Sequence, residues 1–271
     1  MSERADLRAM RGFIFDMDGV IYRGLEAVPG AAGFVANLRR AAIPFVYLTN
    51  NSSAPPDKVA ARLAAMGIPT DPAEVLTSAD VTAAEVSQAV AGRRVLVIGE
   101  EGIRLALARN GFTLVEDHRQ ADAVVVGIDR QVTYARLREA ALAIRRGAPF
   151  YATNTDRTLP TELGLAPGAG AIVGFLEIAT DVRPIVFGKP SPGFFRHALH
   201  RLGTPAELTV AVGDRPETDI LGGQAAGLRT LAVLTGAGTA GEFAAMQPPP
   251  DWVFPSLAEV NAAYFGPGVI A

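Results

Sequence analysis

Short apolar runs alternate with longer stretches of helical period along most of the chain. The short runs are rich in Val, Ile and Phe, which favour strands, and the longer stretches are rich in Ala, Leu and Arg. This alternation is typical of a parallel β-sheet covered by helices, so we predict an α/β fold. We expect strands at Gly12–Phe15, Phe45–Leu48, Arg94–Ile98, Ala123–Gly127, Pro149–Ala152, Ile185–Phe187, Leu208–Val212 and Thr230–Val233.

The helical stretches carry apolar residues at spacings of three and four, as helices packed against a sheet do. Several of them stop at a glycine, such as Gly67, Gly111, Gly203 and Gly227, where a helix C-terminus favours a residue without a side chain. We expect helices at Ala31–Ala41, Pro56–Met66, Ala79–Ala89, Ile103–Asn110, Tyr134–Arg146, Gly193–Leu202, Thr218–Ala226 and Gly241–Ala245.

Four of the predicted strands stop abruptly at residues that can bind a phosphate or a cation. The four polar ends are Asp16-Met17-Asp18-Gly19, Thr49-Asn50-Asn51-Ser52, Gly188-Lys189-Pro190, and Gly213-Asp214 with Asp219 shortly after it. In an open parallel sheet, ligands bind beyond the carboxyl ends of the strands. If the four strands share one sheet, these polar ends converge on one site.

The residue types at these ends suit phosphate chemistry assisted by Mg²⁺. Asp16, Asp18 and Asp214 supply hard oxygen ligands, which Mg²⁺ prefers. Lys189 and Thr49 supply a positive charge and a hydroxyl donor for phosphate oxygens. A cation that bridges carboxylate and phosphate relieves their repulsion, which allows an aspartate to attack phosphorus and form an acyl phosphate.

Asp18 lies two residues beyond Asp16, at a turn that Gly19 permits. From that position its carboxyl group could protonate the leaving alcohol and then deprotonate the attacking water. Such a group favours rapid turnover of a phosphoenzyme over its storage.

Each polar end has a more ordinary interpretation when it is taken alone. A D-x-D-G sequence is usually a turn or a helix cap, Thr49-Asn50 is usually loop chemistry, and a lysine before a proline is usually solvated. Asp214 could likewise sit in a plain turn. The presence of all four, in this order and at strand ends, favours the functional interpretation.

Composition limits the classes of partner. The formal net charge of the 271 residues is -3 and no Lys/Arg-rich run appears, so we expect no nucleic-acid or anionic-membrane surface. No stretch approaches the roughly 18 apolar residues of a membrane span, and the charged N-terminus lacks the apolar run of a signal peptide. The absence of cysteine excludes disulfides and thiol nucleophiles. We expect a cytoplasmic globular protein.

The motifs resemble the haloacid dehalogenase superfamily, and within it the phosphatase branch of the NagD and p-nitrophenyl-phosphatase type. The matching strings are FIFDMDGVIYRG, VYLTNNSS, VFGKPSP and AVGDRPETDI, with a weaker match at YATNTDRTLPTELGLAPGAG. The last of these reads TNTD where similar proteins often have TNPD. The departure removes no reacting group, and it bears on substrate preference.

The resemblance implies a role for each motif residue. Asp16 would be the nucleophile and Asp18 the acid/base, while Thr49, Asn50 and Lys189 would hold the phosphoryl oxygens. The Mg²⁺ ligands would be Asp16, the backbone carbonyl of Asp18, and Asp214. Asp219 would not bind the metal directly but would orient these ligands.

The resemblance also implies a Rossmann-like parallel-sheet core with an inserted α/β cap domain. The core would comprise residues 1–80 and 186–271, and the cap residues 81–185, acting as a lid over the substrate. Within the cap, Asn154, Asp156 and Arg157 are our candidates for the leaving-group pocket, although a simple turn would also account for them. A homodimer is compatible with the family pattern.

The sequence therefore predicts a Mg²⁺-dependent hydrolase of small phosphomonoesters such as sugar phosphates, nucleoside monophosphates, phosphoglycolate or aryl phosphates. Two alternatives use the same residues: a phosphotransferase with an acceptor other than water, and a phospho-ligand-binding regulatory module with little turnover. Dehalogenation is disfavoured, because displacement at carbon needs neither Mg²⁺ nor a second acid.

Overall fold

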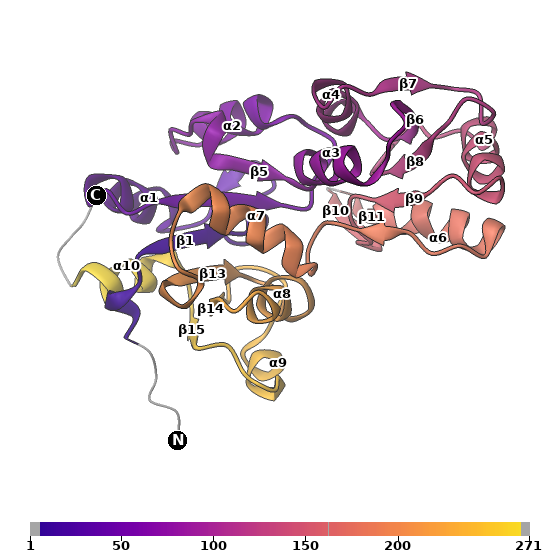
Figure 1. The fold of residues 1–271 in the computed structure, drawn as a ribbon. Coiled ribbons are helices and arrows are strands. Elements are labelled where there is room, and N and C mark those ends of the chain that lie inside the picture. The colour runs from indigo at the N-terminus through magenta and orange to yellow at the C-terminus, as the bar shows by residue number, and fades with distance from the viewer. Residues whose placement is uncertain (1–5, 162, 267–271) are drawn as a thin grey trace. The chain divides into compact units, whose positions relative to one another are not determined.

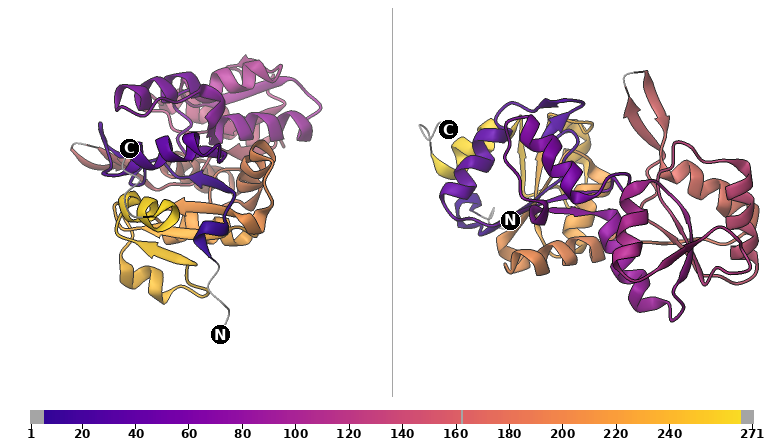
Figure 2. Two further views of the ribbon diagram at one scale, coloured as in Figure 1. Left: turned by 90° about the vertical axis from the view of Figure 1, so that its left-hand side faces the viewer. Right: turned by 90° about the horizontal axis from the view of Figure 1, so that it is seen from above.

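The computed structural model describes residues 6–161 and 163–266 (Figure 1). The described residues form two compact units. Unit 1 comprises the described parts of Met1–Leu48, Val59–Leu76 and Lys189–Ala271, and unit 2 comprises Thr49–Lys58 and Thr77–Gly188. Each unit has its own β-sheet, and the sheet of unit 1 combines indigo strands from the first part of the chain with orange and yellow strands from the last part (Figure 2).

Unit 1 contains a six-stranded sheet in the order β15-β14-β13-β1-β4-β5. The strands are β1 (Gly12–Phe15), β4 (Phe45–Thr49), β5 (Val75–Thr77), β13 (Thr209–Gly213), β14 (Arg229–Val233) and β15 (Trp252–Phe254). The pairs that β1 forms with β13 and with β4 are parallel, and so are those that β14 forms with β13 and with β15. Strand β1 is buried along its whole length, as expected of a central strand in a parallel sheet.

Helices cover both faces of this sheet. Phe13 and Phe15 point to one face, where they contact Phe34 of α1 (Ala31–Arg40), and Phe13 also contacts Tyr264 of α10 (Leu257–Phe265). Ile14 points to the opposite face because side chains alternate along a strand. Helix α8 (Leu221–Ala225) packs there through Gly223, and it contacts α7 (Pro192–Leu202).

The remaining elements of unit 1 are short. They are the hairpin β2 (Tyr22–Arg23) and β3 (Glu26–Ala27), the helices α2 (Pro56–Ala65, mostly within unit 1) and α9 (Ala240–Ala245), the 3-10 turns Leu7–Ala9, Pro72–Glu74 and Ala206–Leu208, and the π-helical turn Pro216–Ile220.

Unit 2 contains a five-stranded parallel sheet in the order β12-β9-β8-β6-β7. The strands are β6 (Arg94–Ile98), β7 (Thr113–Val115), β8 (Ala123–Val126), β9 (Phe150–Ala152) and β12 (Ile185–Val186). The helices are α3 (Ser78–Ala89), α4 (Glu101–Arg109), α5 (Tyr134–Arg145) and α6 (Ala169–Thr180). A hairpin of β10 (Thr158–Thr161) and β11 (Gly164–Pro167) projects away from the sheet, as the right-hand view of Figure 2 shows.

The two faces of the unit 2 sheet bury separate apolar cores, because alternate residues of β6 and β8 point in opposite directions. Val95, Val97 and Val125 pack against residues of α3 and α4. Leu96 and Val124 pack against residues of α5 and α6. The predicted α/β fold with a parallel-sheet core is thereby confirmed.

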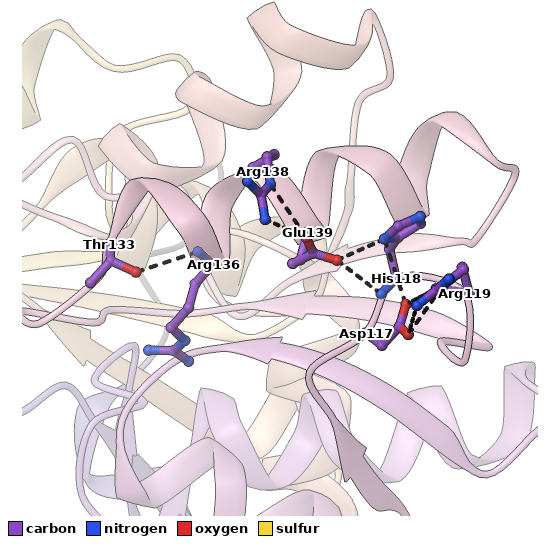
Figure 3. Close-up of polar contacts among 7 residues, drawn as sticks. All are labelled: Asp117, His118, Arg119, Thr133, Arg136, Arg138 and Glu139. Atoms are coloured by element: carbon purple, nitrogen blue, oxygen red, sulfur yellow. Dashed lines mark hydrogen bonds and ion pairs between the residues drawn. The ribbon is translucent and has the colours of Figure 1, made fainter.

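A polar cluster attaches the segment after β7 to helix α5 (Figure 3). The His118 ring Nδ1 lies 2.7 Å from Glu139 Oε2, and Arg138 donates to the other oxygen of the same carboxylate at 2.9 Å. Arg119 makes paired hydrogen bonds to Asp117, the nearest at 2.7 Å. Both carboxylates of the cluster therefore already have cationic or hydrogen-bonding partners from the protein.

The structure differs from the predicted elements mainly in short strands and in three helical segments. Strands β5, β7 and β15 and helices α6 and α10 were not predicted, and the expected helix Thr218–Ala226 is a π-helical turn followed by the short helix α8. Within the described part of the chain, none of the helices has the length and hydropathy that crossing a membrane would require.

Candidate active site

Asp16 and Asp214 leave neighbouring strands of unit 1 at the same edge of the sheet. Phe15 of β1 pairs with Val212 of β13, and the Asp16 amide continues the ladder by donating to Val212 O at 2.9 Å. Because the two strands are parallel, their carboxyl ends point the same way. Two carboxylates far apart in sequence are thus held side by side by β-sheet pairing.

Asp219 joins them from the π-helical turn that follows β13. Carboxylate oxygens of Asp16, Asp214 and Asp219 all lie within 4.8 Å of one another. Asp219 Oδ2 accepts hydrogen bonds from the amides of Asp214 and Arg215, at 3.2 and 3.0 Å. The wider turn of a π-helix folds Asp219 back onto the strand end, a geometry often found at functional sites.

Lys189 supplies the positive charge of the cluster. Its Nζ donates to Asp16 Oδ1 and, at 2.7 Å, to Asp219 Oδ1, and its side chain is only 5% exposed. Burial alone would lower the pKa of Lys189, but Asp16 and Asp219 outweigh that effect and raise the pKa above its usual range. The lysine is therefore charged, and it orients Asp16.

The carboxylates remain under-compensated by this single lysine. Burial raises the pKa of Asp16 well above its ordinary value, although Lys189 opposes the shift. Burial, followed by repulsion from Asp219, raises the pKa of Asp214 to about 6. An excess of negative charge in a buried site favours binding of a cation.

Asp214 has a free ligand atom for such a cation. Its Oδ2 accepts from the Ala237 amide at 2.7 Å, whereas its Oδ1 is buried and has no hydrogen-bond partner among the described residues. A buried, unpaired carboxylate oxygen is costly unless something else binds it. Together with the hard oxygen donors around it, this atom fits Mg²⁺ or a similar divalent ion.

Two glycines let the backbone approach Asp214 closely. A Cβ atom at Gly19 would lie 2.5 Å from Asp214 Oδ2, and one at Gly236 would lie 1.9 Å from the same atom. Gly19 also has a positive φ of 81°, which other residues rarely adopt. Thr235 fixes the two loops together by donating to Gly19 O at 2.6 Å.

Asp18 lies beside this cluster and reaches solvent. Its Oδ2 accepts a long hydrogen bond of 3.4 Å from the Tyr22 hydroxyl, and the Arg62 guanidinium lies 4.4 Å from the centre of the Tyr22 ring. Partial loss of water around the carboxyl group raises the pKa of Asp18, while Arg62 and Tyr22 oppose the shift. A carboxyl group with a raised pKa is suited to donating and accepting protons.

Thr49 and Asn50 belong to unit 2. Thr49 is the last residue of β4, and its Oγ1 accepts from the Asn51 amide at 3.1 Å, which leaves the hydroxyl proton to donate elsewhere. The Asn50 side-chain nitrogen lies 3.2 and 3.3 Å from the two oxygens of Asp156.

The three candidates for the leaving-group pocket differ in their surroundings. Asn154 is buried and its amide donates to Asn50 O at 2.7 Å, whereas Asp156 is half-buried and Arg157 is exposed. Their role in substrate binding stays a prediction.

Sequence reasoning did not assign a role to Tyr22 or Arg62, although it did place the loop from Thr235 to Gly241, which contains Gly236 and Ala237, at the rim of the active site. Tyr22 is only four residues from Asp18 and follows it in the same turn, so local spacing could have suggested it. Arg62 approaches from helix α2, in a distant part of the chain, and no local pattern marks it.

Comparison with known proteins supports the motif assignment. The model of haloacid dehalogenase-like hydrolases matches residues 13–113, and a HAD-hydrolase-like model matches residues 186–260. The 5'-nucleotidase YutF of Bacillus subtilis is 42% identical over 230 residues, which cover 85% of this chain and 89% of YutF.

Two solved structures extend the likeness to the fold. The 4-nitrophenylphosphatase of Thermotoga maritima has a TM-score of 0.89 at 32% identity, covering 96% of this chain and 99% of that protein. The glycerol phosphate phosphatase Rv1692 of Mycobacterium tuberculosis, solved in complex with magnesium, has a TM-score of 0.87 at 37% identity, covering 93% of this chain and 76% of that one. The chain therefore belongs to the haloacid dehalogenase-like hydrolases, in the phosphatase branch that its motifs resemble.

Proposed function

We propose that this hydrolase is a Mg²⁺-dependent phosphatase of small phosphomonoesters that works through an aspartyl phosphate on Asp16. The observation that carries the proposal is the cluster of three carboxylates around Lys189, with one buried Asp214 oxygen unpaired. The relatives named above are phosphatases and a nucleotidase, which supports the same class of reaction.

In the first step, a carboxylate oxygen of Asp16 attacks phosphorus and the bond from phosphorus to the leaving alcohol breaks. Lys189 holds Asp16 in orientation by its hydrogen bond, and its charge also offsets negative charge that develops on the phosphoryl oxygens. Asp18, whose raised pKa favours the protonated form, donates its proton to the leaving oxygen.

In the second step, a water molecule attacks phosphorus of the aspartyl phosphate. Asp18, now ionised, accepts the proton of this water, and the bond from phosphorus to Asp16 breaks to release inorganic phosphate. Both catalytic carboxyl groups return to their starting protonation states, so the cycle balances.

The metal would be held by Asp16, Asp214 and the backbone carbonyl of Asp18. When bound, Mg²⁺ supplies positive charge that offsets the repulsion between the nucleophilic carboxylate and the phosphate. Asp219 would act indirectly, since both of its oxygens already accept hydrogen bonds from Lys189 and from backbone amides.

Thr49 and Asn50 would contact the phosphoryl oxygens through the hydroxyl and amide groups described above. The substrate class that we propose is small metabolite or aryl phosphates, such as sugar phosphates, nucleoside monophosphates or phosphoglycolate. The assignment of residues 81–185 as the cap domain stays part of this proposal.

The test is phosphate release from a panel of small phosphomonoesters, in Mg²⁺ and in EDTA. We expect turnover that requires the metal and falls by about three orders of magnitude or more in Asp16→Asn. Asp181→Asn is the matched control, because Asp181 is 89% exposed at the end of α6.

Turnover that survives both EDTA and Asp16→Asn would overturn the proposal. Tight phosphate binding without turnover on any substrate would favour a regulatory module instead. Transfer of the phosphoryl group to an added alcohol in preference to water would indicate a phosphotransferase.

A further inference from the structure

The segment Thr49–Lys58, here called the strap, connects β4 to α2 and belongs to unit 2 by its contacts. It carries Thr49 and Asn50, the residues to which the proposed function gives phosphoryl contacts. The strap begins directly after Leu48, the last residue of unit 1 before it. The groups that hold the strap therefore decide how these two residues are presented.

Side chains from two other parts of unit 2 hold Asn50. The Asn50 carbonyl accepts from Asn154 Nδ2 and from Ser78 Oγ, both at 2.7 Å, and all three groups are buried. The Asn50 side-chain nitrogen faces the Asp156 carboxylate. Hydrogen bonds from two directions to one buried carbonyl leave its peptide group little freedom to rotate.

The next residues of the strap are attached to helix α4. The amides of Gly102 and Ile103 donate to the carbonyls of Ser53 and Ser52, at 2.9 and 3.0 Å, so the strap provides acceptors for the free N–H groups of this helix N-terminus. The Ser52 side chain is completely buried and accepts from Thr153 Oγ1 at 3.1 Å. The strap is thus an integral part of unit 2.

Close packing reinforces this attachment at two glycines. A Cβ atom at Gly102 would lie 2.5 Å from Ser52 O, and one at Gly127 would lie 2.5 Å from Ser52 Oγ. A larger residue at Gly102 would have to displace the backbone of the strap, and one at Gly127 would have to displace the Ser52 hydroxyl.

The polar atoms of Asn154 are already used within the protein. Besides donating to Asn50 O, the side chain accepts from the Asp156 amide through Oδ1 at 3.0 Å, and its Nδ2 also lies 3.4 Å from Thr153 Oγ1. Only 4% of Asn154 is exposed. A side chain in this state is suited to fixing the backbone and poorly suited to recognising a leaving group.

We propose that Asn154 is a positioning residue, which acts on phosphoryl transfer by fixing the Asn50 peptide group and with it the Thr49 hydroxyl. This inference rests on the proposed function, because it requires Thr49 and Asn50 to contact the phosphoryl group. It replaces the expectation that Asn154 lines the leaving-group pocket.

The first test compares substrates with different leaving groups. In Asn154→Ala, kcat/KM should fall by about 10–100-fold, since small misplacements of contacting groups have effects of that size. The factor should be the same for p-nitrophenyl phosphate and for an alkyl phosphate, and the inhibition constant of inorganic phosphate should rise. Losses of kcat/KM that differ more than tenfold between these substrates would overturn the proposal and restore a leaving-group contact.

The second test measures the strap without any substrate. Hydrogen exchange at the Asn51 amide, which donates to Thr49 Oγ1, should be faster in Asn154→Ala than in the wild type. Unchanged exchange at Asn51 would overturn the proposal. This measurement does not depend on turnover, so it separates the two proposals. If Asn154→Ala speeds exchange at Asn51 but Asp16→Asn leaves turnover unchanged, the proposed function is wrong and the positioning of the strap by Asn154 still stands.

Two further variants keep the tests interpretable. Asn110→Ala is the matched control, because Asn110 also donates its side-chain amide to a backbone carbonyl, Ala106 O at 2.8 Å, in the same unit. It should leave kcat/KM within about twofold of the wild type. If Asn154→Ala does not fold, Ser78→Ala removes the other donor to Asn50 O, and it should lower kcat/KM by the same factor for both substrates; no effect there would contradict the proposal.

Discussion

The Lys189 ammonium group pairs with Asp16 and Asp219, and Asp214 lies within 4.8 Å of both carboxylates in a region that is largely closed to water. The pKa values of Asp16 and Asp214 are raised because burial disfavours their ionised forms. Without a bound metal ion, the ionised forms of Asp16 and Asp214 are unfavourable in the folded state at neutral pH. The ionised carboxylates of Asp16 and Asp214 therefore reduce the stability of the metal-free protein.

We predict that Asp214→Asn stabilises the metal-free protein at neutral pH and abolishes its stabilisation by Mg²⁺. The folded-state pKa of Asp214, about 6, lies above the ordinary value of 3.8, so its unfavourable contribution is fully present above pH 6. That contribution disappears as the pH falls towards 4. In EDTA, the melting temperature of the variant should exceed that of the wild type by a few degrees at pH 7.5, since about 1 kcal/mol shifts Tm by roughly 2–4 °C in a domain of this size.

Thermal unfolding at several pH values and Mg²⁺ concentrations provides the measurement. The difference between variant and wild type should narrow as the pH falls from about 7 to 4. An equal gain of Tm from Mg²⁺ in both proteins would exclude Asp214 as a metal ligand.

Gly236 offers a second prediction at the scale of one residue. Because a Cβ atom there would lie 1.9 Å from Asp214 Oδ2, Gly236→Ala must displace either the loop or the carboxylate. We expect the Mg²⁺ concentration for half-maximal turnover to rise about tenfold, as when groups that orient a metal ligand are lost. Gly241→Ala is the control, because a Cβ atom at Gly241 meets nothing within 4 Å; equal metal requirements in the two variants would contradict the prediction.

At the scale of elements, the turn after β13 shows why local sequence was insufficient. The sequence predicted a helix at Thr218–Ala226, but the chain forms a π-helical turn at Pro216–Ile220 before α8 begins at Leu221. The wider turn lets Asp219 accept from the amides of Asp214 and Arg215. These hydrogen bonds arise from packing at the sheet edge, which helix propensity does not describe.

Helix α6 and the short outer strands were missed for other reasons. The residues of α6 are apolar on all sides of the helix, including the exposed Ile178. The periodic pattern that marks an amphipathic helix is therefore weak in its sequence. Strands β7 and β15 have only three residues each, and they form because β6 and β14 offer a free edge. Pairing with a neighbouring strand, and not the residues of β7 and β15 alone, gives these segments their extended structure.

The contact between His118 and Glu139 of α5 leads to a prediction of how stability depends on pH. Hydrogen bonds from the His118 ring and from Arg138 lower the pKa of Glu139 to about 2 (Figure 3). The stabilisation is therefore fully present above the ordinary pKa of 4.5 and is lost as the pH falls towards 2. Because the carboxylate is partly exposed, we expect Glu139→Gln to lower the free energy of unfolding by at most about 1 kcal/mol at pH 7.

Urea titrations at pH 7 and at about pH 3 measure this difference. The effect of Glu139→Gln should shrink at the lower pH, whereas Glu177→Gln on the neighbouring helix α6 should change little at either pH. A larger effect of Glu139→Gln at the lower pH would contradict the assignment.

For the whole molecule, the division into two units separates the acidic cluster from the strap. Asp16, Lys189, Asp214 and Asp219 all belong to unit 1, whereas Thr49 and Asn50 belong to unit 2. Binding of Mg²⁺ without phosphate should therefore slow hydrogen exchange in unit 1 only. Phosphate, which the proposed function places in contact with residues of both groups, should affect both units.

Hydrogen exchange gives this expectation a measurable form. Adding Mg²⁺ should slow exchange at the Ala237 and Arg215 amides, which bond to the acidic cluster, and leave β6 and β8 of unit 2 unchanged. Adding phosphate with Mg²⁺ should also slow exchange at Asn51. If Mg²⁺ alone protects mainly the unit 2 sheet, the assignment of the metal to the carboxylates of unit 1 is wrong.

The sequence by itself determined the α/β alternation and the family, and it predicted the residues that would carry the chemistry, because strand ends and motifs are local properties of the chain. Tertiary structure alone decided which atoms meet: that Lys189 bridges Asp16 and Asp219, that Asp214 keeps an unpaired oxygen, and that Asn154 holds the strap. These outcomes depend on strand order, on burial and on close approach at glycines. Each of those arises only when segments far apart in sequence pack together, so no local pattern could reveal them.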